Sequence, residues 1–112
     1  MSTDYILPGL VVAFVLWRIL SGFLARRRIP ALLQEGAQVV DVRSPGEFAG
    51  GHAQGCVNIP LQDISERSRE LDRNRYVIVC CASGTRSAMA AHRLRRLGFN
   101  RVLNAGSWRS LR

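Results

Sequence analysis

The chain has 112 residues, a length that accommodates one small domain and little more. Its net charge of +8 comes from sixteen arginines against eight acidic residues, a balance that suits anionic partners. No RNA- or DNA-binding motif accompanies this charge, so we expect no nucleic-acid partner. The three cysteines form neither a disulfide framework nor a zinc-ligand pattern, which predicts free thiols, a reducing compartment and no metal or other cofactor.

The N-terminal segment is apolar from Ile6 to Ala25 and, as a helix, would be about 30 Å long, the thickness of a bilayer core. Its one charge is Arg18, whose long side chain can extend toward the basic run at 26–28. The positive-inside rule places that basic run in the cytoplasm. We therefore predict a single-pass anchor with a basic flank at 1–28 and a cytoplasmic domain at 29–112, with the lipid bilayer as a partner.

Three alternatives for this segment stay open. A cleaved signal peptide carries its positive charge before the apolar run, which is the reverse of the order seen here. A helix that lies on the membrane surface needs a polar face, and residues 10–17 have none. The third alternative is a buried helix of the soluble domain. The composition favours the anchor over all three.

The remainder of the chain alternates helices with short apolar strands. A capping box, in which Ser44 precedes Pro45 and Glu47, predicts the start of one short helix. Helices are expected at 29–36, 44–48, 61–71 and 85–97, and strands at 38–42, 56–59, 76–80 and 101–104. This alternation predicts a parallel sheet covered by helices on both faces, with ligands bound beyond the carboxyl ends of the strands.

The segment from Tyr76 to Ser87 carries the most chemical information. The pattern predicts a strand that ends in a cysteine, then a short turn of small residues, then a helix that begins near Arg86, with Cys80 and Cys81 adjacent at the end of the apolar run. A thiol in this position faces backbone N–H groups and the positive end of a helix dipole. Both favour the thiolate, which is the nucleophilic form of cysteine.

Two groups of motifs resemble rhodanese domains. The first half contains Asp41-Val42-Arg43-Ser44-Pro45-Gly46-Glu47-Phe48, Gly51-His52 and Gly55-Cys56-Val57-Asn58-Ile59-Pro60. The second half contains Cys81-Ala82-Ser83-Gly84-Thr85-Arg86-Ser87-Ala88, Leu97-Gly98-Phe99 and Ala105-Gly106-Ser107-Trp108. The resemblance covers nearly all of 29–108, and it implies a rhodanese-like three-layer α/β/α domain with a central parallel sheet, preceded here by one transmembrane helix.

The same resemblance implies a sulfurtransferase of the thiosulfate type. Cys81 would be the catalytic cysteine, which takes sulfane sulfur from a small anionic donor such as thiosulfate, forms a persulfide and passes the sulfur to cyanide or a thiol. The substrate-binding residues would be Ala82, Ser83, Gly84, Thr85 and Arg86, with Ser87 as a further hydroxyl donor. A membrane-protein partner would explain the anchor. The family implies scaffold roles for Asp41, Arg43 and Glu47, and a structural hydrogen bond for His52.

Cys80 supports a second reading, because Cys80 to Arg86 spells the Cys-x5-Arg loop of phosphatases and arsenate reductases. We favour Cys81, since the preceding residue of a strand points its side chain to the opposite face. Cys80 is then a small buried hydrophobe or an accessory redox partner of Cys81, and Cys56 is inert packing. A catalytically idle rhodanese module that docks a partner protein is the remaining alternative.

Overall fold

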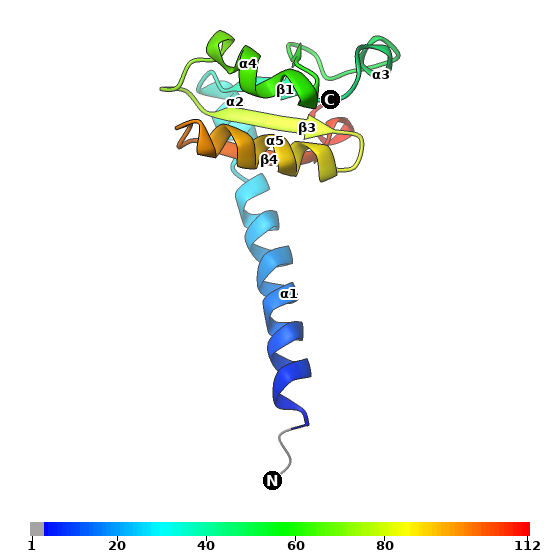
Figure 1. Ribbon diagram of the computed structural model, residues 1–112, viewed down its shortest axis with the longest axis vertical. Helices are drawn as coiled ribbons and strands as arrows, with labels where there is room; N and C mark the ends of the chain where they lie inside the picture. Colours follow the sequence, from blue (N-terminus) through cyan, green and yellow to red (C-terminus); the bar gives the residue numbers. More distant parts are fainter. Residues whose placement is uncertain (1–3) are drawn as a thin grey trace.

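The protein is described by a computed structural model that covers residues 4–112. The long helix α1 (Ile6–Arg26) projects from a sheet-containing body, and its C-terminal end contacts the edge strand β4 (Val102–Ser107) (Figure 1). The predicted fold class is confirmed: one long apolar helix precedes an α/β domain built on a parallel sheet.

Four strands form the sheet in the order β2-β1-β3-β4, and every neighbouring pair is parallel. The strands are β1 (Gln38–Asp41), β2 (Val57–Asn58), β3 (Val77–Cys81) and β4. Every residue of β3 is buried, as expected for a central strand covered on both faces. Asp41 at the end of β1 lies beside Cys80 on β3, so the carboxyl ends of the two central strands meet at one edge.

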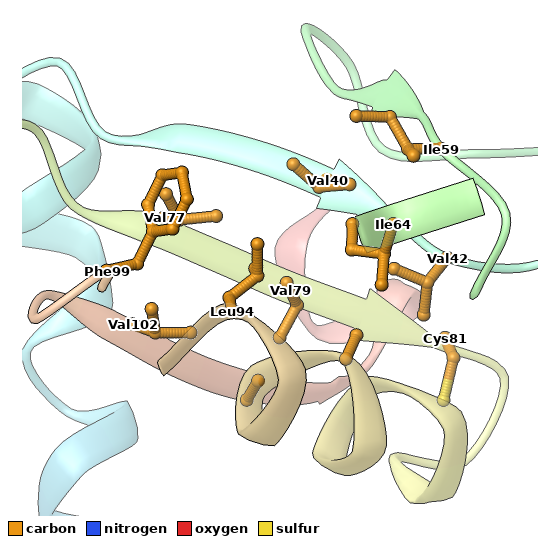
Figure 2. Packing of buried hydrophobic residues seen from close by; sticks show 12 residues of the cluster. Val40, Val42, Ile59, Ile64, Val77, Val79, Cys81, Leu94, Phe99 and Val102 are labelled. Atoms are coloured by element: carbon orange, nitrogen blue, oxygen red, sulfur yellow. The ribbon is translucent and has the colours of Figure 1, made fainter. Parts of the chain in front are cut away.

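Helices cover both faces of this sheet. On one face, α4 (Ile64–Arg67) and α5 (Thr85–Arg96) enclose a core of Val40, Val42, Ile59, Ile64, Val77, Val79, Cys81, Ala90, Ala91, Leu94, Phe99 and Val102 (Figure 2). On the other face, α2 (Ile29–Gln34) and the short 3-10 turn η3 (Trp108–Leu111) enclose Ile29, Leu32, Ile78, Cys80, Ala105 and Trp108. The two adjacent cysteines therefore belong to opposite faces of β3, as strand geometry predicts.

The helix α3 (Pro45–Ala49) confirms the predicted capping box. The Glu47 N–H donates to Ser44 Oγ at 3.3 Å, and the Ser44 N–H donates to Glu47 Oε1 at 3.1 Å. Two backbone donors that the first turn leaves unpaired are thereby satisfied. The cap holds the chain that leaves β1 in a defined direction over the end of the sheet.

The predicted helix at 61–71 is wrong as a single element. The segment forms a 3-10 turn η1 (Leu61–Asp63), one turn of α-helix α4 and a second 3-10 turn η2 (Ser68–Glu70). The Ser68 hydroxyl donates to the Ser65 carbonyl at 2.9 Å, a local bond that competes with the backbone ladder of a helix. Two serines and an aspartate also have low helix propensity, so burial of Ile64 alone does not sustain a continuous helix.

Strand β4 runs three residues beyond its predicted end and contains an irregularity. Val79 pairs with Asn104 but Cys80 pairs with Gly106, which leaves Ala105 as an extra residue in β4. Gly106 has a φ of +80°, a conformation that side chains disfavour, so glycine suits this bulge. Asn104, opposite Val79, is the last residue of β4 in regular register before the bulge.

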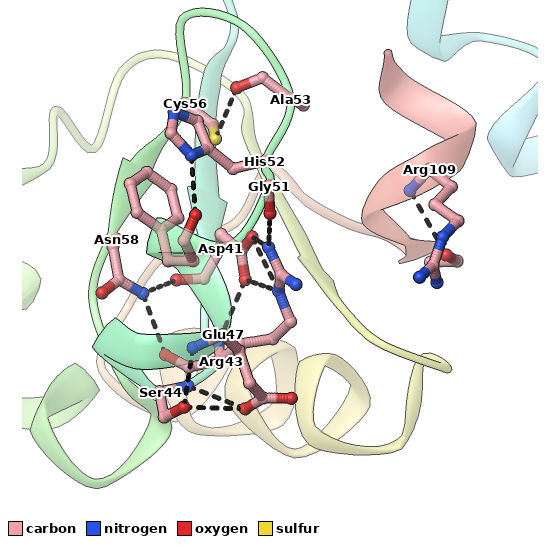
Figure 3. A network of polar contacts seen from close by, with 12 residues as sticks. Asp41, Arg43, Ser44, Glu47, Gly51, His52, Ala53, Cys56, Asn58 and Arg109 are labelled. Atoms are coloured by element: carbon pink, nitrogen blue, oxygen red, sulfur yellow. Dashed lines mark hydrogen bonds and ion pairs between the residues drawn. The ribbon is translucent and has the colours of Figure 1, made fainter.

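A buried ion pair links β1 to the loop that follows α3. The Arg43 guanidinium donates from Nη2 to Asp41 Oδ2 at 2.7 Å and to the Gly51 carbonyl at 2.7 Å (Figure 3). Its Nε donates to Asp41 Oδ1 at 2.9 Å, and its carbon centre lies 4.7 Å from the Trp108 ring centroid. Asn58 donates to the carbonyls of both charged residues at 2.9 Å. These contacts agree with the scaffold role that the family resemblance implied.

Candidate active site

Cys81 is the last residue of β3, and its sulfur faces the beginning of α5 (Figure 2). Sγ accepts hydrogen bonds from the backbone N–H of Gly84 at 2.9 Å and of Ser87 at 3.4 Å. The Ser87 hydroxyl lies 3.4 Å from the same sulfur. The strand, the turn and the first turn of the helix thus place three polar groups around one thiol.

The turn depends on Gly84, which has a φ of +106°. A Cβ at this position would lie 3.2 Å from the Cα of Gly106, closer than ordinary van der Waals contact. Glycine is therefore required both for the left-handed backbone and for the close approach of the turn to β4. This conformation directs the Gly84 N–H at the sulfur.

Opposing effects act on the Cys81 thiol. Burial raises its pKa, but hydrogen bonds that the thiolate accepts from the Ser87 hydroxyl and from the backbone of Ser87, Gly84 and Ser83 outweigh burial, and the pKa is lowered overall. The N-terminal end of α5 adds the positive end of a helix dipole. The site can therefore hold a thiolate although only 1% of the residue is exposed.

The other two thiols have different surroundings. Cys80 packs among apolar side chains, and burial together with the nearby Asp41 charge raises its pKa to about 12. Cys56 is half-buried and donates its S–H to the Ala53 carbonyl at 2.8 Å (Figure 3). Burial also raises the pKa of Cys56. Only Cys81 combines an acceptor sulfur with several N–H donors.

We expect iodoacetamide to modify Cys81 first when the folded protein is treated near pH 7. A lowered pKa gives Cys81 a larger thiolate fraction than the other two cysteines, and the thiolate is the reacting species. Exposure does not explain such a preference, since Cys80 at 0% and Cys81 at 1% are equally buried. Peptide mass mapping after short exposures measures the order. Equal labelling of Cys80 and Cys81 in the folded protein would contradict the assignment; equal labelling in denaturant is the control.

The predicted binding residues 82–86 lie together in the turn and the start of α5. The side chains of Ser83 and Thr85 are exposed, and Ala82 is half-buried. Beside this turn, a cavity of about 250 Å³ is lined by Val42, Ser44, Leu61, Gln62, Arg86 and Arg93. The cavity brings two arginines to the region where the chain leaves β1 and enters α5.

Arg86 has a partner that sequence reasoning did not assign to it. Its guanidinium donates to both carboxylate oxygens of Glu47, at 2.7 Å and 3.0 Å. The hydrogen bonds from Arg86, followed by those from Ser44, lower the pKa of Glu47 to about 2. Both side chains are partly exposed, at 37% and 40%, so the ion pair lies within reach of a solute. Arg86 is therefore held by an internal carboxylate.

Asn104 is a further residue of the site that the sequence did not indicate. Its side-chain amide donates to the Gly84 carbonyl at 3.1 Å and accepts from the Ser87 hydroxyl at 2.6 Å. The only signal in the sequence was a polar residue at the end of an apolar strand. His52 is stacked on Phe48, and its Nδ1 lies 2.8 Å from the Phe48 carbonyl, in agreement with the predicted structural hydrogen bond. Within residues 4–112, no three His, Cys, Asp or Glu side chains gather as a metal site.

Comparison with known proteins identifies the family. Residues 27–111 match the family described as Rhodanese-like domain. The chain belongs to this family. The thiosulfate sulfurtransferase PspE of Escherichia coli (strain K12) is 36% identical over 74 residues, which cover 64% of this chain and 71% of PspE. YqhL of Bacillus subtilis (strain 168) is 35% identical over 99 residues, which cover 82% of this chain and 79% of YqhL.

Solved rhodaneses share the fold. A rhodanese with anions from E. coli superposes with a TM-score of 0.63 at 36% identity, covering 66% of this chain and 89% of that one. The human single-domain sulfurtransferase TSTD1 superposes with a TM-score of 0.66 at 26% identity, covering 74% and 88%. The predicted rhodanese membership is thus confirmed, and the named relatives of this rhodanese domain include thiosulfate sulfurtransferases.

Proposed function

We propose that this rhodanese protein is a membrane-anchored sulfurtransferase that carries sulfane sulfur as a persulfide on Cys81. The observation that carries the proposal is the set of N–H donors on Cys81 Sγ, from Gly84 at 2.9 Å and Ser87 at 3.4 Å. Donors aimed at this sulfur stabilise the attacking thiolate. Family membership and the names of the relatives support the same reaction class.

The reaction has two steps. The Cys81 thiolate attacks the outer sulfur of thiosulfate, the S–S bond of the donor breaks, and sulfite leaves with the bonding electron pair. The product is an anionic persulfide on Cys81, whose outer sulfur lies near the amides of the turn. A cyanide ion or a thiolate then attacks that outer sulfur, and the Cys81 thiolate leaves unchanged for the next cycle. Such a scheme gives ping-pong kinetics.

In this proposal the turn from Ala82 to Thr85 cradles the donor, and Arg86 binds its anionic end. The guanidinium of Arg86 can donate two hydrogen bonds to an oxyanion, as it does to the two carboxylate oxygens of Glu47. The donor must therefore replace Glu47 on Arg86 or bind beside the pair. The cavity lined by Arg86 and Arg93 offers room next to this position.

Intact-mass spectrometry tests the proposal. After incubation with thiosulfate and removal of excess reagent, the wild-type chain is expected to gain the mass of one sulfur atom. Cys80→Ala should gain the same mass and Cys81→Ala should gain none. Absence of the adduct from the wild-type chain would leave a partner-docking module as the function. Arsenate reductase or phosphatase turnover that requires Cys80 would point to the longer Cys-x5-Arg loop.

The anchor part of the proposal rests on α1. Its apolar side chains are exposed over the whole helix, its most apolar window has a mean hydropathy of 2.0, and its 21 residues are about 31 Å long. Exposed apolar surface of this extent is costly in water and favourable in lipid. Three consecutive arginines at 26–28 lie between the apolar helix and the domain, so the positive-inside rule places the domain on the cytoplasmic side.

A groove between α1 and the body adds to this reading. It has a volume of about 440 Å³, and its lining includes Arg18, Arg26 and Arg95 but no carboxylate. Three cations without a carboxylate suit anionic lipid headgroups at the cytoplasmic surface. The proposed division of the chain is therefore an anchor with its basic flank at 1–28 and a rhodanese domain at 29–112.

Fractionation tests the anchor. The full chain is expected to sediment with membranes, to resist extraction by high salt and to require detergent, whereas a chain that begins at Ile29 should stay in solution. Salt would release a helix held on the surface by arginines alone. Recovery of the full chain as a soluble monomer without detergent would remove the anchor, and a mature protein that lacks 1–28 would identify a signal sequence.

A further inference from the structure

Asn104 contacts both the turn and the helix that surround Cys81. Its Oδ1 accepts from the Ser87 hydroxyl at 2.6 Å and from the Gly106 N–H at 2.9 Å, and its Nδ2 donates to the Gly84 carbonyl at 3.1 Å. The Gly106 N–H can only donate and the Gly84 carbonyl can only accept, so the orientation of the amide is determined. Ser87 must therefore donate its proton to Asn104.

This direction fixes the contact between Ser87 and the sulfur. A hydroxyl has one proton, and here that proton is directed to Asn104. The 3.4 Å contact between Ser87 Oγ and Cys81 Sγ must then have the thiol as donor. The chain of hydrogen bonds runs from Cys81 S–H to Ser87 Oγ and from Ser87 O–H to Asn104 Oδ1. Ser87 is fully buried, so water does not supply a substitute proton.

Ionisation of Cys81 requires the opposite arrangement. A thiolate has no proton to donate, and the Ser87 hydroxyl can bond to it only by turning its proton away from Asn104. Asn104 Oδ1 keeps the Gly106 N–H as a donor after that change, so it is not left without a partner. The cysteine sulfur and the Asn104 oxygen thus compete for one hydroxyl proton.

We propose that Asn104 is a positioning residue that, by holding the proton of Ser87, favours the protonated state of the resting Cys81 thiol. When Cys81 ionises, the Ser87 hydroxyl keeps its proton but turns it from Asn104 to the sulfur, so that it donates a hydrogen bond to the thiolate. This inference rests on the proposed function only in taking Cys81 as the reacting sulfur.

The charged and titratable groups around Cys81 come from four elements. Arg86 lies on α5 and is paired with Glu47 of α3, Cys80 precedes Cys81 on β3, and Asp41 ends the neighbouring strand β1. Replacing the neutral residues Asn104 and Ser87 with alanine changes none of these charges. If the effects of the two substitutions on the Cys81 ionisation midpoint are not additive, the non-additive part therefore reports on the hydrogen bond between Asn104 and Ser87.

The experiment is a double-mutant cycle on the ionisation of Cys81. It uses the full chain in detergent with Cys56→Ala and Cys80→Ala, so that the ultraviolet absorbance of the thiolate reports on Cys81 alone. The pH at which half of Cys81 is ionised is measured for this parent protein, for Asn104→Ala, for Ser87→Ala and for the double variant. No sulfur donor is present, so failure of the sulfurtransferase proposal cannot be mistaken for failure of this one.

The cycle compares the shift that Asn104→Ala causes in the pH midpoint of Cys81 ionisation in two backgrounds. The shift in the protein that retains Ser87 is expected to be more strongly downward than the shift in the Ser87→Ala protein. The expected difference between the two shifts is on the order of one pH unit, which corresponds to one hydrogen bond. Any loosening of the turn through the lost Gly84 contact acts in both backgrounds and cancels. Equal shifts in the two backgrounds, or a difference of the opposite sign, would overturn the proposal.

Two further variants complete the test. Asn104→Asp keeps an oxygen that accepts from Ser87 and Gly106, and its carboxylate holds the hydroxyl proton of Ser87 more strongly. The shift of the Cys81 midpoint should therefore be more strongly upward in the protein that retains Ser87 than in the Ser87→Ala protein. This variant decides the question if Asn104→Ala does not fold. Asn58→Ala is the matched control, because Asn58 also binds two backbone carbonyls at a sheet end but does not contact Ser87. It should show no difference between the backgrounds.

Discussion

Replacing Asp41 with asparagine is expected to lower the free energy of unfolding by about 3 kcal/mol, because it leaves the buried Arg43 guanidinium without its counter-charge. Asp41 is 0% exposed and Arg43 is 5% exposed. Their pairing comprises three side-chain hydrogen bonds of 2.7–3.0 Å and one from the Arg43 backbone N–H at 3.1 Å. Urea denaturation of the full chain in detergent, followed by the circular dichroism of the sheet domain, measures the change.

Two comparisons show whether this loss comes from the unpaired charge. Glu70→Gln removes one partner of the exposed pair between Arg67 and Glu70, and it should change stability far less. Combining Asp41→Asn with Arg43→Met removes the buried charge and keeps an apolar contact with Trp108, so it should restore part of the loss. An Asp41→Asn protein as stable as Glu70→Gln would show that the pair does not organise the end of β1.

Replacing Glu47 with glutamine is expected to lower the KM for thiosulfate several-fold, because it removes the carboxylate that occupies Arg86. Glutamine still serves in the capping box of α3, so the start of that helix is preserved. Arg86→Gln is expected to reduce kcat/KM for thiosulfate by roughly ten- to a hundred-fold, the effect of losing a charge-assisted contact with the donor. Steady-state kinetics at varied thiosulfate and fixed cyanide measure both changes.

The pH dependence separates Glu47 from Cys81 in these assays. The lowered pKa of Glu47, about 2, keeps its carboxylate ionised throughout the neutral range, so the effect of Glu47→Gln should not vary from pH 5 to pH 8. The activity of the wild-type protein should instead rise as the Cys81 thiol ionises. A higher KM in Glu47→Gln would contradict the competition and would mean that Glu47 positions Arg86 for the donor.

Local sequence signals predicted the elements that depend on neighbours in the chain. Ser44, Pro45 and Glu47 placed the start of α3, because a capping box is completed within four residues. The helix predicted at 85–97 matches α5 (Thr85–Arg96), where an apolar face continues until glycine follows at position 98. The segment at 61–71 failed because its apolar spacing suits a helix while its serines form local bonds.

Contacts between distant residues were beyond the reach of the sequence. The pair between Arg86 and Glu47 joins residues 39 positions apart, and both had been given other tasks. The link from Ser87 to Asn104 joins residues 17 positions apart, and a bulge at Ala105 shifts the register of β4 by one residue directly after Asn104. Nothing in the local composition predicts that irregularity.

The sequence by itself determined the family, the alternation of strands and helices, and the placement of a cysteine between a buried strand and the start of a helix. These depend on periodicity, turn residues and motif spacing, which act over a few residues at a time. Only the tertiary structure decided which sulfur receives N–H donors, which carboxylate holds Arg86 and where the Ser87 proton points. The physical reason is that hydrogen-bond direction and charge pairing depend on distances of a few tenths of an ångström between groups that folding brings together.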